Sequence, residues 1–381
     1  MAANKPVPKR DVNARTAQLV KLLTEVGPDI PEISRRLGQF KESVRYRYKE
    51  KIVNRGFAVQ ASVDHERLGL KRFILLVDFA EEYRRFAQAI LTAMNGLCYL
   101  VSYSKTLPLG LYVVNFSAPV EFTEEIKSFL RSLQEKGMFT RLEIMEFDWL
   151  RPSPMRAESY NFDTGRWEFD WSNPSANGFE SAKYAPSSPT KYDFVDLLLI
   201  KEMQMNANKT LKEISDNLKL NYKKLAWHYS AHVKARHLLH GFIVNWMGTR
   251  YDYKIEKALH RKHRYLGLHL LVRNVSEYEL ISLRQAANRL PFLWSEAVGR
   301  TYSAEFAFPM DYTVEGLQYI SKTIDNVRNR SELLIADQSE ALSFTVPYSL
   351  YDYAHKKWIF DSYSLSKRFD NLILQIKNGQ T

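Results

Sequence analysis

The same order of predicted elements occurs twice along this chain, and the duplication limits the fold more than any other feature of the sequence. Each copy begins with three short amphipathic helices and an alternating strand, and continues with a strand, a helix, two strands, a helix and a final strand. The first part has the outline of a winged helix-turn-helix, and the βαββαβ order that follows is that of a ferredoxin-like unit. The sequence therefore predicts an α+β fold built from two copies of this pair.

A matching aromatic segment closes each copy, YNFDTGRWEFD from Tyr160 and YDYAHKKWIFD from Tyr351. We interpret both as small two-stranded hairpins with a packing or pseudo-dimer role. Residues 172–190 are rich in Pro, Ser and Asn, which indicates a linker between the copies. The predicted boundaries are a basic arm at 1–12, a winged helix-turn-helix at 13–70, a ferredoxin-like domain with hairpin at 71–171, the linker at 172–190, a second winged helix-turn-helix at 191–250, a connector, ferredoxin-like domain and hairpin at 251–362, and a C-terminal helix at 363–381.

Composition favours a polyanionic partner. The chain of 381 residues carries 54 Lys and Arg against 43 Asp and Glu, a net charge of +11. No apolar run is long enough to span a membrane, and the N-terminus lacks the apolar core of a signal peptide. The single cysteine, Cys98, excludes an internal disulfide and a zinc site built from cysteines. We expect a cytoplasmic, nucleoid-associated protein that does not contact a membrane.

The segment KESVRYRYKEKIVNRGF, residues 41–57, has the pattern of a helix that meets phosphate. It holds six Lys or Arg and two acids, and Val44, Tyr48 and Ile52 recur every four residues as one buried stripe. Tyrosine can bond phosphate or lie along sugar, so its interleaving with the cations favours contact with nucleic acid. The predicted DNA contacts of this first recognition helix are Lys41, Ser43, Arg45, Tyr46, Arg47 and Lys49.

The second candidate recognition helix lies in NYKKLAWHYSAHVKARHLLHG, which contains no acid. Its predicted DNA contacts are Lys223, Lys224, His228, Tyr229 and Lys234. His228 and His232 are four apart, a spacing that could hold a metal, but no acid or thiol lies near them in the sequence. We therefore expect surface placement or phosphate contact for these histidines, and no metal site.

The repeated order, the junction VDHERLGLKRFILLVDF and the string SVRYRYKEKIVNRGF resemble the Lrp/AsnC, or feast/famine, transcriptional regulators of bacteria and archaea. The resemblance implies binding of double-stranded DNA, pairing through the ferredoxin-like domains, and one chain that acts as a covalent dimer. Family members bind amino-acid effectors near a turn that carries glycine and acidic residues. The corresponding turns here, KTLPLGLY and VGRTYSAE, lack an acidic pair, so a small-molecule effector is left open.

Two other readings compete with a DNA-binding regulator. Tandem chains of this type also resemble the siroheme decarboxylases, which act on a tetrapyrrole with His and Arg, and His260, His263 and Arg264 are the candidates for that role. A nucleoid-associated architectural protein, or a scaffold, would use the same fold without reading a sequence. No nucleophile, metal set or phosphate loop is discernible, so we expect no catalytic residues, no cofactor and no enzyme. Two unlike recognition helices would read half-sites roughly 10 bp apart.

Overall fold

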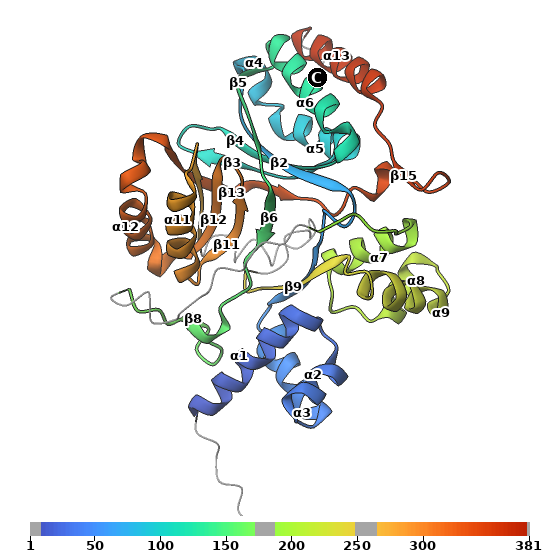
Figure 1. Ribbon diagram of the computed structural model, residues 1–381, viewed down its shortest axis with the longest axis vertical. Helices are drawn as coiled ribbons and strands as arrows, with labels where there is room; N and C mark the ends of the chain where they lie inside the picture. The colour runs from blue at the N-terminus through green and yellow to red at the C-terminus, as the bar shows by residue number, and fades with distance from the viewer. Residues whose placement is uncertain (1–8, 172–186, 248–264, 379–381) are drawn as a thin grey trace, which may run out of the picture.

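The computed structural model describes residues 9–171, 187–247 and 265–378, and within them the predicted duplication is confirmed (Figure 1). The first copy contains α1 (Lys9–Val26), α2 (Ile30–Leu37), α3 (Lys41–Tyr48), a π-helical segment (Lys49–Val53), β1 (Ala58–Val63), β2 (Leu70–Phe79), α4 (Glu81–Arg84), α5 (Ala87–Cys98), β3 (Leu100–Leu107), β4 (Tyr112–Pro119), α6 (Thr123–Glu135), β5 (Phe139–Glu146), β6 (Trp149–Pro152), β7 (Tyr160–Asn161) and β8 (Arg166–Trp167).

The second copy repeats this order. It contains α7 (Phe194–Met205), α8 (Leu211–Leu218), α9 (Tyr222–Trp227), a π-helical segment (His228–Lys234), β9 (Leu239–Asn245), β10 (Tyr265–Val272), α11 (Glu277–Arg289), β11 (Leu293–Val298), β12 (Tyr302–Pro309), α12 (Thr313–Thr323), β13 (Ser331–Ser343), β14 (Tyr351–Asp352) and β15 (Lys357–Trp358), and α13 (Ser362–Lys377) ends the chain.

Three local predictions differ from the structure. Helix α1 begins at Lys9, four residues before the predicted start. The single helix predicted after the first strand of the first βαββαβ unit is interrupted between α4 and α5. The single final strand predicted for the first copy is two strands, because β5 pairs with β2 of its own copy whereas β6 pairs with β11 of the other. The pairing partner changes at Phe147 and Asp148, a change that periodicity within one segment does not record.

The two ferredoxin-like domains share one nine-stranded antiparallel sheet, in the order β5-β2-β4-β3-β13-β10-β12-β11-β6. The long strand β13 pairs with β10 through its first half and with β3 through its second half. The sheet begins with β5 and ends with β6, which are consecutive in the chain, so its two edges come together. Pairing through the sandwiches therefore occurs within the chain.

The sheet faces that the helices leave uncovered pack against each other. Ile74, Leu76 and Val113 of the first copy form one buried apolar cluster with Leu271 and Leu334 of the second. An ionic network joins the same faces, since Arg141 bonds Glu332 at 3.0 Å and Arg273 bonds both Glu143 and Glu332. Apolar burial thus joins the two copies, and the paired charges fix their register.

Each winged helix-turn-helix unit packs against the wing of the other copy. Their wings form a two-stranded antiparallel sheet, β1 with β9. Helix α7 contacts the wing of the first copy, because the Gln60 side chain donates to the Gln204 carbonyl at 3.0 Å and the Ala207 amide donates to the Val59 carbonyl at 2.9 Å. Helix α1 packs on β9 of the second copy in the same way. Each unit is therefore held by the wing of the other.

The aromatic hairpins form as predicted, and each joins its own helix-turn-helix to the sandwich of the other copy. In the first hairpin, Tyr160 packs on Phe57 beside α3, while the Trp167 ring lies 5.3 Å from that of Phe292 in the second sandwich. In the second hairpin, the Trp358 ring lies 6.2 Å from Tyr192 and 5.9 Å from Tyr99 in the first sandwich.

The C-terminal helix α13 forms as predicted, and it docks on the first sandwich. Phe369 is buried against Phe129 of α6, with ring centroids 5.3 Å apart, and Lys136 pairs with Asp370 at 2.5 Å. Figure 1 shows α13 beside α6. In the described part of the chain, no helix combines the length and the apolar character needed to cross a membrane.

Candidate functional site

The local geometry around α3 is that of a helix-turn-helix. Asp29 caps α2 by accepting the Glu32 amide at 3.1 Å, and Gly38 ends it in the left-handed conformation, with φ at 61°. The stripe of Val44, Tyr48 and Ile52 is buried as predicted. Because this stripe fixes the rotation of α3, the remaining positions of the helix face outward.

Most of the predicted DNA contacts of α3 are on the surface. Lys41, Ser43, Arg45, Tyr46 and Lys49 are exposed, and Tyr46 is 71% exposed. Arg45 pairs with Glu42 at 2.6 Å, but such an exposed pair contributes only about 0–1 kcal/mol, so phosphate can displace the carboxylate.

Arg47 differs from these because it is half-buried and donates to Gln39 Oε1 at 2.7 Å. Beside it, a cavity of about 700 Å³ follows one face of α3 and its π-helical segment. That face carries Arg47 and Lys51 but also Glu50, and Lys51 pairs with Asp163 of the first hairpin at 2.6 Å. The cations on this side are therefore partly balanced by acids.

In the second recognition segment, only some of the predicted DNA contacts lie on the surface. Lys223, Lys224 and Lys234 are exposed, and Lys234 lies 3.9 Å from Asp29 of the first unit. Tyr229 is half-buried, and loss of solvation raises the pKa of its hydroxyl. Trp227, by contrast, is 54% exposed.

The prediction of His228 as a DNA contact is wrong, and so is the expected surface placement of His232. Both rings are buried, with 3% and 8% of the residue exposed, and both Nδ1 atoms lie 2.9 Å from the carboxylate of Asp196. Asp196 belongs to α7, more than thirty positions earlier in the chain. Sequence spacing could not show it, because only the packing of α7 on the recognition segment brings this carboxylate to the histidines.

A different group of residues, polar and apolar, meets at the junction of the wings and the sandwiches. His65 follows β1, Arg72 lies in β2, His240 lies in β9, and Trp149 and Leu150 lie in β6. These residues line a cavity of about 490 Å³. The volume is within the range typical of small-molecule sites.

Both histidines of this junction cavity favour the neutral form. Loss of solvation, followed by the charge of Arg72 and the neighbouring His240, holds the pKa of His65 well below its usual range. Loss of solvation also lowers the pKa of His240, although Asp64 opposes the shift. His65 Nδ1 lies 2.5 Å from the Ser117 hydroxyl, which fixes its ring. The cavity therefore combines neutral imidazoles with a guanidinium.

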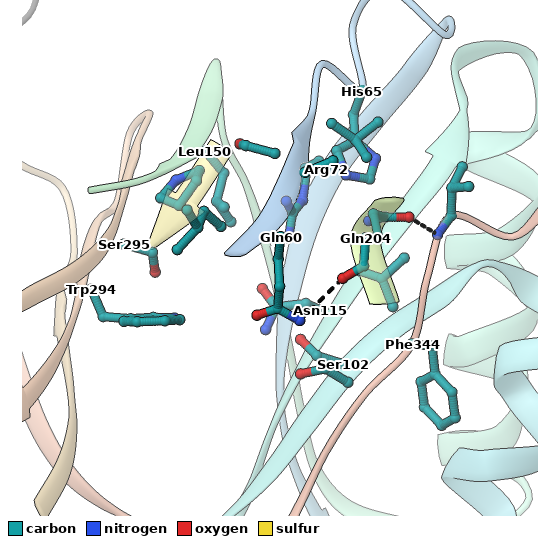
Figure 2. Close-up of a pocket in the computed structure, with 18 of the residues that line it drawn as sticks. Gln60, His65, Arg72, Ser102, Asn115, Leu150, Gln204, Trp294, Ser295 and Phe344 are labelled. Atoms are coloured by element: carbon teal, nitrogen blue, oxygen red, sulfur yellow. Dashed lines mark hydrogen bonds between the residues drawn. The ribbon is translucent and has the colours of Figure 1, made fainter. Parts of the chain in front are cut away.

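A second, smaller cavity of about 120 Å³ shares His65, Arg72 and Leu150 with the first. Figure 2 shows Arg72 and Gln60 in the middle of this cavity, between Trp294 on β11 and Gln204 at the end of α7. The two cavities therefore share part of their lining, and residues from both copies of the repeat line them.

Sequence reasoning missed this junction. His65 and Arg72 both occur in the string VDHERLGLKRFILLVDF, which we quoted only as a resemblance, and their distance along the chain from His240 hid the cluster. The three residues suggested for tetrapyrrole chemistry, His260, His263 and Arg264, lie outside the described residues, as does most of the predicted connector.

Comparisons with known proteins show the fold. No family model matches the sequence, and no curated protein matches it. The siroheme decarboxylase NirDL superimposes with a TM-score of 0.53 at 9% identity, over 95% of this chain and 99% of that one. NirDL in complex with an iron-uroporphyrin III analogue gives 0.52 at 10% identity, over 97% and 100%. A third structure, PH0061, covers 41% of this chain at 20% identity with a TM-score of 0.30. The chain therefore has the tandem α+β fold of NirDL along nearly its whole length.

Proposed function

We propose that this chain is a DNA-binding regulator that contacts the duplex through α3 and, with fewer side chains, through α9. The observation that carries the proposal is the exposed row of Lys41, Arg45, Tyr46 and Lys49 on a helix whose opposite stripe is buried. A helix presented in this way can enter the major groove while its cations neutralise phosphates. The net charge of +11 acts in the same direction.

The second unit supports a more limited role in binding. Lys223 and Lys224 are exposed at the start of α9, where the Asn221 side chain caps the helix by accepting the Lys224 amide at 3.2 Å. His228 is withdrawn from this surface, so the second unit offers phosphate contacts near its helix N-terminus. Unlike surfaces on the two units favour an asymmetric or degenerate DNA site.

The test is binding of the full chain to a labelled DNA duplex, measured by fluorescence anisotropy over a series of salt concentrations. Arg45→Ala with Arg47→Ala should weaken binding and reduce the slope of log K against log salt by roughly 1.8 if both side chains neutralise phosphates. The melting temperature should fall only modestly, because the Arg45–Glu42 pair is exposed and Arg47 contributes one half-buried hydrogen bond to Gln39.

A charge-matched control is Arg84→Ala with Arg85→Ala. Both arginines are exposed around α4 on the first sandwich, remote from the helix-turn-helix. This variant has the same net charge as the test variant, so it separates local contact from general attraction. Equal binding by the two variants, or unchanged binding by the α3 variant, would remove α3 from the interface.

A second candidate function is an enzyme that acts on a tetrapyrrole, and the junction cavity favours it. NirDL, by its name, is a siroheme decarboxylase, and its fold extends over nearly the whole of this chain. A decarboxylase substrate carries carboxylates, and Arg72 of the cavity could bind one while the neutral His65 donates or accepts a proton.

Visible absorbance during titration with iron uroporphyrin III tests this candidate. A saturable spectral change that Arg72→Ala weakens, and that Arg84→Ala leaves intact, would support it. Binding that both variants retain, or no change with the unmodified chain, would oppose it. The same preparations should be used for the DNA measurement, because the two functions occupy different surfaces and can be tested separately.

A further inference from the structure

Four side chains from two elements of the second helix-turn-helix meet at one point. Asp193 and Asp196 lie at the start of α7, and His228 and His232 lie on the π-helical segment after α9. Each residue offers one ligand atom, and these atoms all lie within 4.8 Å of one another. His228 Nδ1 is 2.9 Å from Asp196 and 3.6 Å from Asp193, and His232 Nδ1 is 2.9 Å from Asp196.

The cluster is enclosed and its parts are held in place. Asp196 is fully buried and His228 and His232 nearly so, while Asp193 is half-buried. The exposed Trp227 ring lies 5.0 Å from His228 and 4.6 Å from His232.

Backbone groups orient both carboxylates. The Asp193 carboxylate accepts the Val195 amide at 2.9 Å, and the Asp196 carboxylate accepts the Asp193 amide at 2.9 Å. Ligands oriented by hydrogen bonds of this kind are typical of metal centres.

The cluster brings two acidic side chains together in a largely buried place, and buried charge is costly unless it is paired. A divalent cation would neutralise both carboxylates. The described part of the chain places no Lys or Arg in ion-pair contact with Asp193 or Asp196.

We infer that Asp193, Asp196, His228 and His232 bind one divalent metal ion of the zinc class. Zn²⁺ takes imidazole nitrogen and carboxylate oxygen at about 2.0–2.2 Å in tetrahedral sites, which places ligand atoms roughly 3.3 Å apart. The three His–Asp separations of 2.9, 2.9 and 3.6 Å bracket this value, and all the ligand atoms lie within 4.8 Å of one another. Mg²⁺ and Ca²⁺ prefer all-oxygen ligands, so the two nitrogens favour Zn²⁺ or Co²⁺.

The ion joins α7 to the recognition segment of the second unit. Its binding energy therefore adds to the stability of that unit, because the ligands come together only in the folded chain. This inference does not depend on the proposed DNA binding, since the four residues lie inside the unit.

Titration of the chelator-treated full chain with Co²⁺ tests the site. A tetrahedral site gives an intense visible band, and we expect saturation at one Co²⁺ per chain, loss of the band on addition of Zn²⁺, and a higher Tm with either metal. His232→Gln retains a side chain that can bond Asp196 but loses the imidazole ligand, so Co²⁺ affinity should fall by at least roughly 100-fold.

Two further variants complete the experiment. His355→Gln removes an exposed histidine that bonds Asp352 in the second hairpin, and it should bind Co²⁺ as the unmodified chain does. Asp193→Asn keeps a residue able to cap α7 and removes one charged ligand, so it replaces His232→Gln if that variant does not fold. A full chain without the band, or ligand variants that bind as tightly as His355→Gln, would overturn the inference.

Discussion

The two helix-turn-helix units have the same backbone plan but use the same helix positions for different chemistry. Asp29, Glu32 and Gly38 of the first unit correspond to Thr210, Glu213 and Lys219 of the second, each 181 positions later. The same offset pairs Arg47 with His228 and Lys51 with His232. In the first unit these positions bond Gln39 and Asp163 at the surface, whereas in the second they turn inward to Asp196.

This difference shows how a duplicated helix-turn-helix unit can diverge without losing its fold. Thr16 of α1 holds the buried position that Asp196 holds in α7, since each precedes a buried aliphatic residue, Val20 or Ile200, by four. One buried carboxylate changes which side chains can pack around it, because it requires hydrogen-bond donors or a cation as partners. The second unit meets this requirement with His228 and His232, at the positions where the first unit carries Arg47 and Lys51.

The largest expected effect comes from removing the buried carboxylate. Asp196→Ala leaves two buried imidazoles without their partner, so we expect the unfolding free energy to fall by about 3 kcal/mol. Thr16→Ala, at the matching position of the first unit, should cost about 1 kcal/mol. Chemical denaturation of both variants measures the difference. Similar losses would show that the Asp196 network adds no more than ordinary packing.

An intermediate effect is expected at the junction, where His65 of the first half meets His240 of the second. The folded-state pKa of His65 is lowered. Below about pH 6.5 the unfolded chain therefore binds more protons than the folded chain, and the folded state becomes less stable as the pH is lowered. The charges of Arg72 and His240 oppose protonation of His65. At His240, the carboxylates of Asp64 and Glu66 favour protonation. The slope should approach about 1.4 kcal/mol per pH unit for each such group.

Denaturation of the unmodified chain and of His65→Gln between pH 7 and pH 5 provides the measurement. The variant should lose less stability on acidification, and the exposed His355→Gln serves as the control for removing any imidazole. A pH dependence identical in all three proteins would contradict the assignment to His65.

The smallest effect distinguishes the two turns. Gly38 and Lys219 both end the second helix of their unit in the left-handed conformation, with φ at 61° and 53°. Only glycine adopts this conformation without strain, so Gly38→Ala should destabilise and Lys219→Gly stabilise, each by about 1 kcal/mol. No atom lies within 4 Å of a Cβ built on Gly38, so conformational strain alone is measured. Shifts of the same sign would disprove the equivalence of the turns.

Much of the architecture was predictable because it follows from the hydrophobic periodicity of single helices and strands. The buried stripe of Val44, Tyr48 and Ile52 and the repeated order of helices and strands are found as predicted. Each depends on residues within a few positions of one another. The exposed cations of α3 were predictable for the same reason, since a buried stripe fixes the opposite face.

The sites required the tertiary structure. The exchange of wings and hairpins between copies, the continuation of β13 from β10 to β3, and the convergence of His65, Arg72 and His240 join residues from distant parts of the chain. The sequence by itself determined that two like halves would form, because helix and strand periods are local properties. Only the packed chain decided that His228 and His232 face Asp196 rather than the surface, because side-chain surroundings depend on which elements pack together, and sequence spacing does not record that.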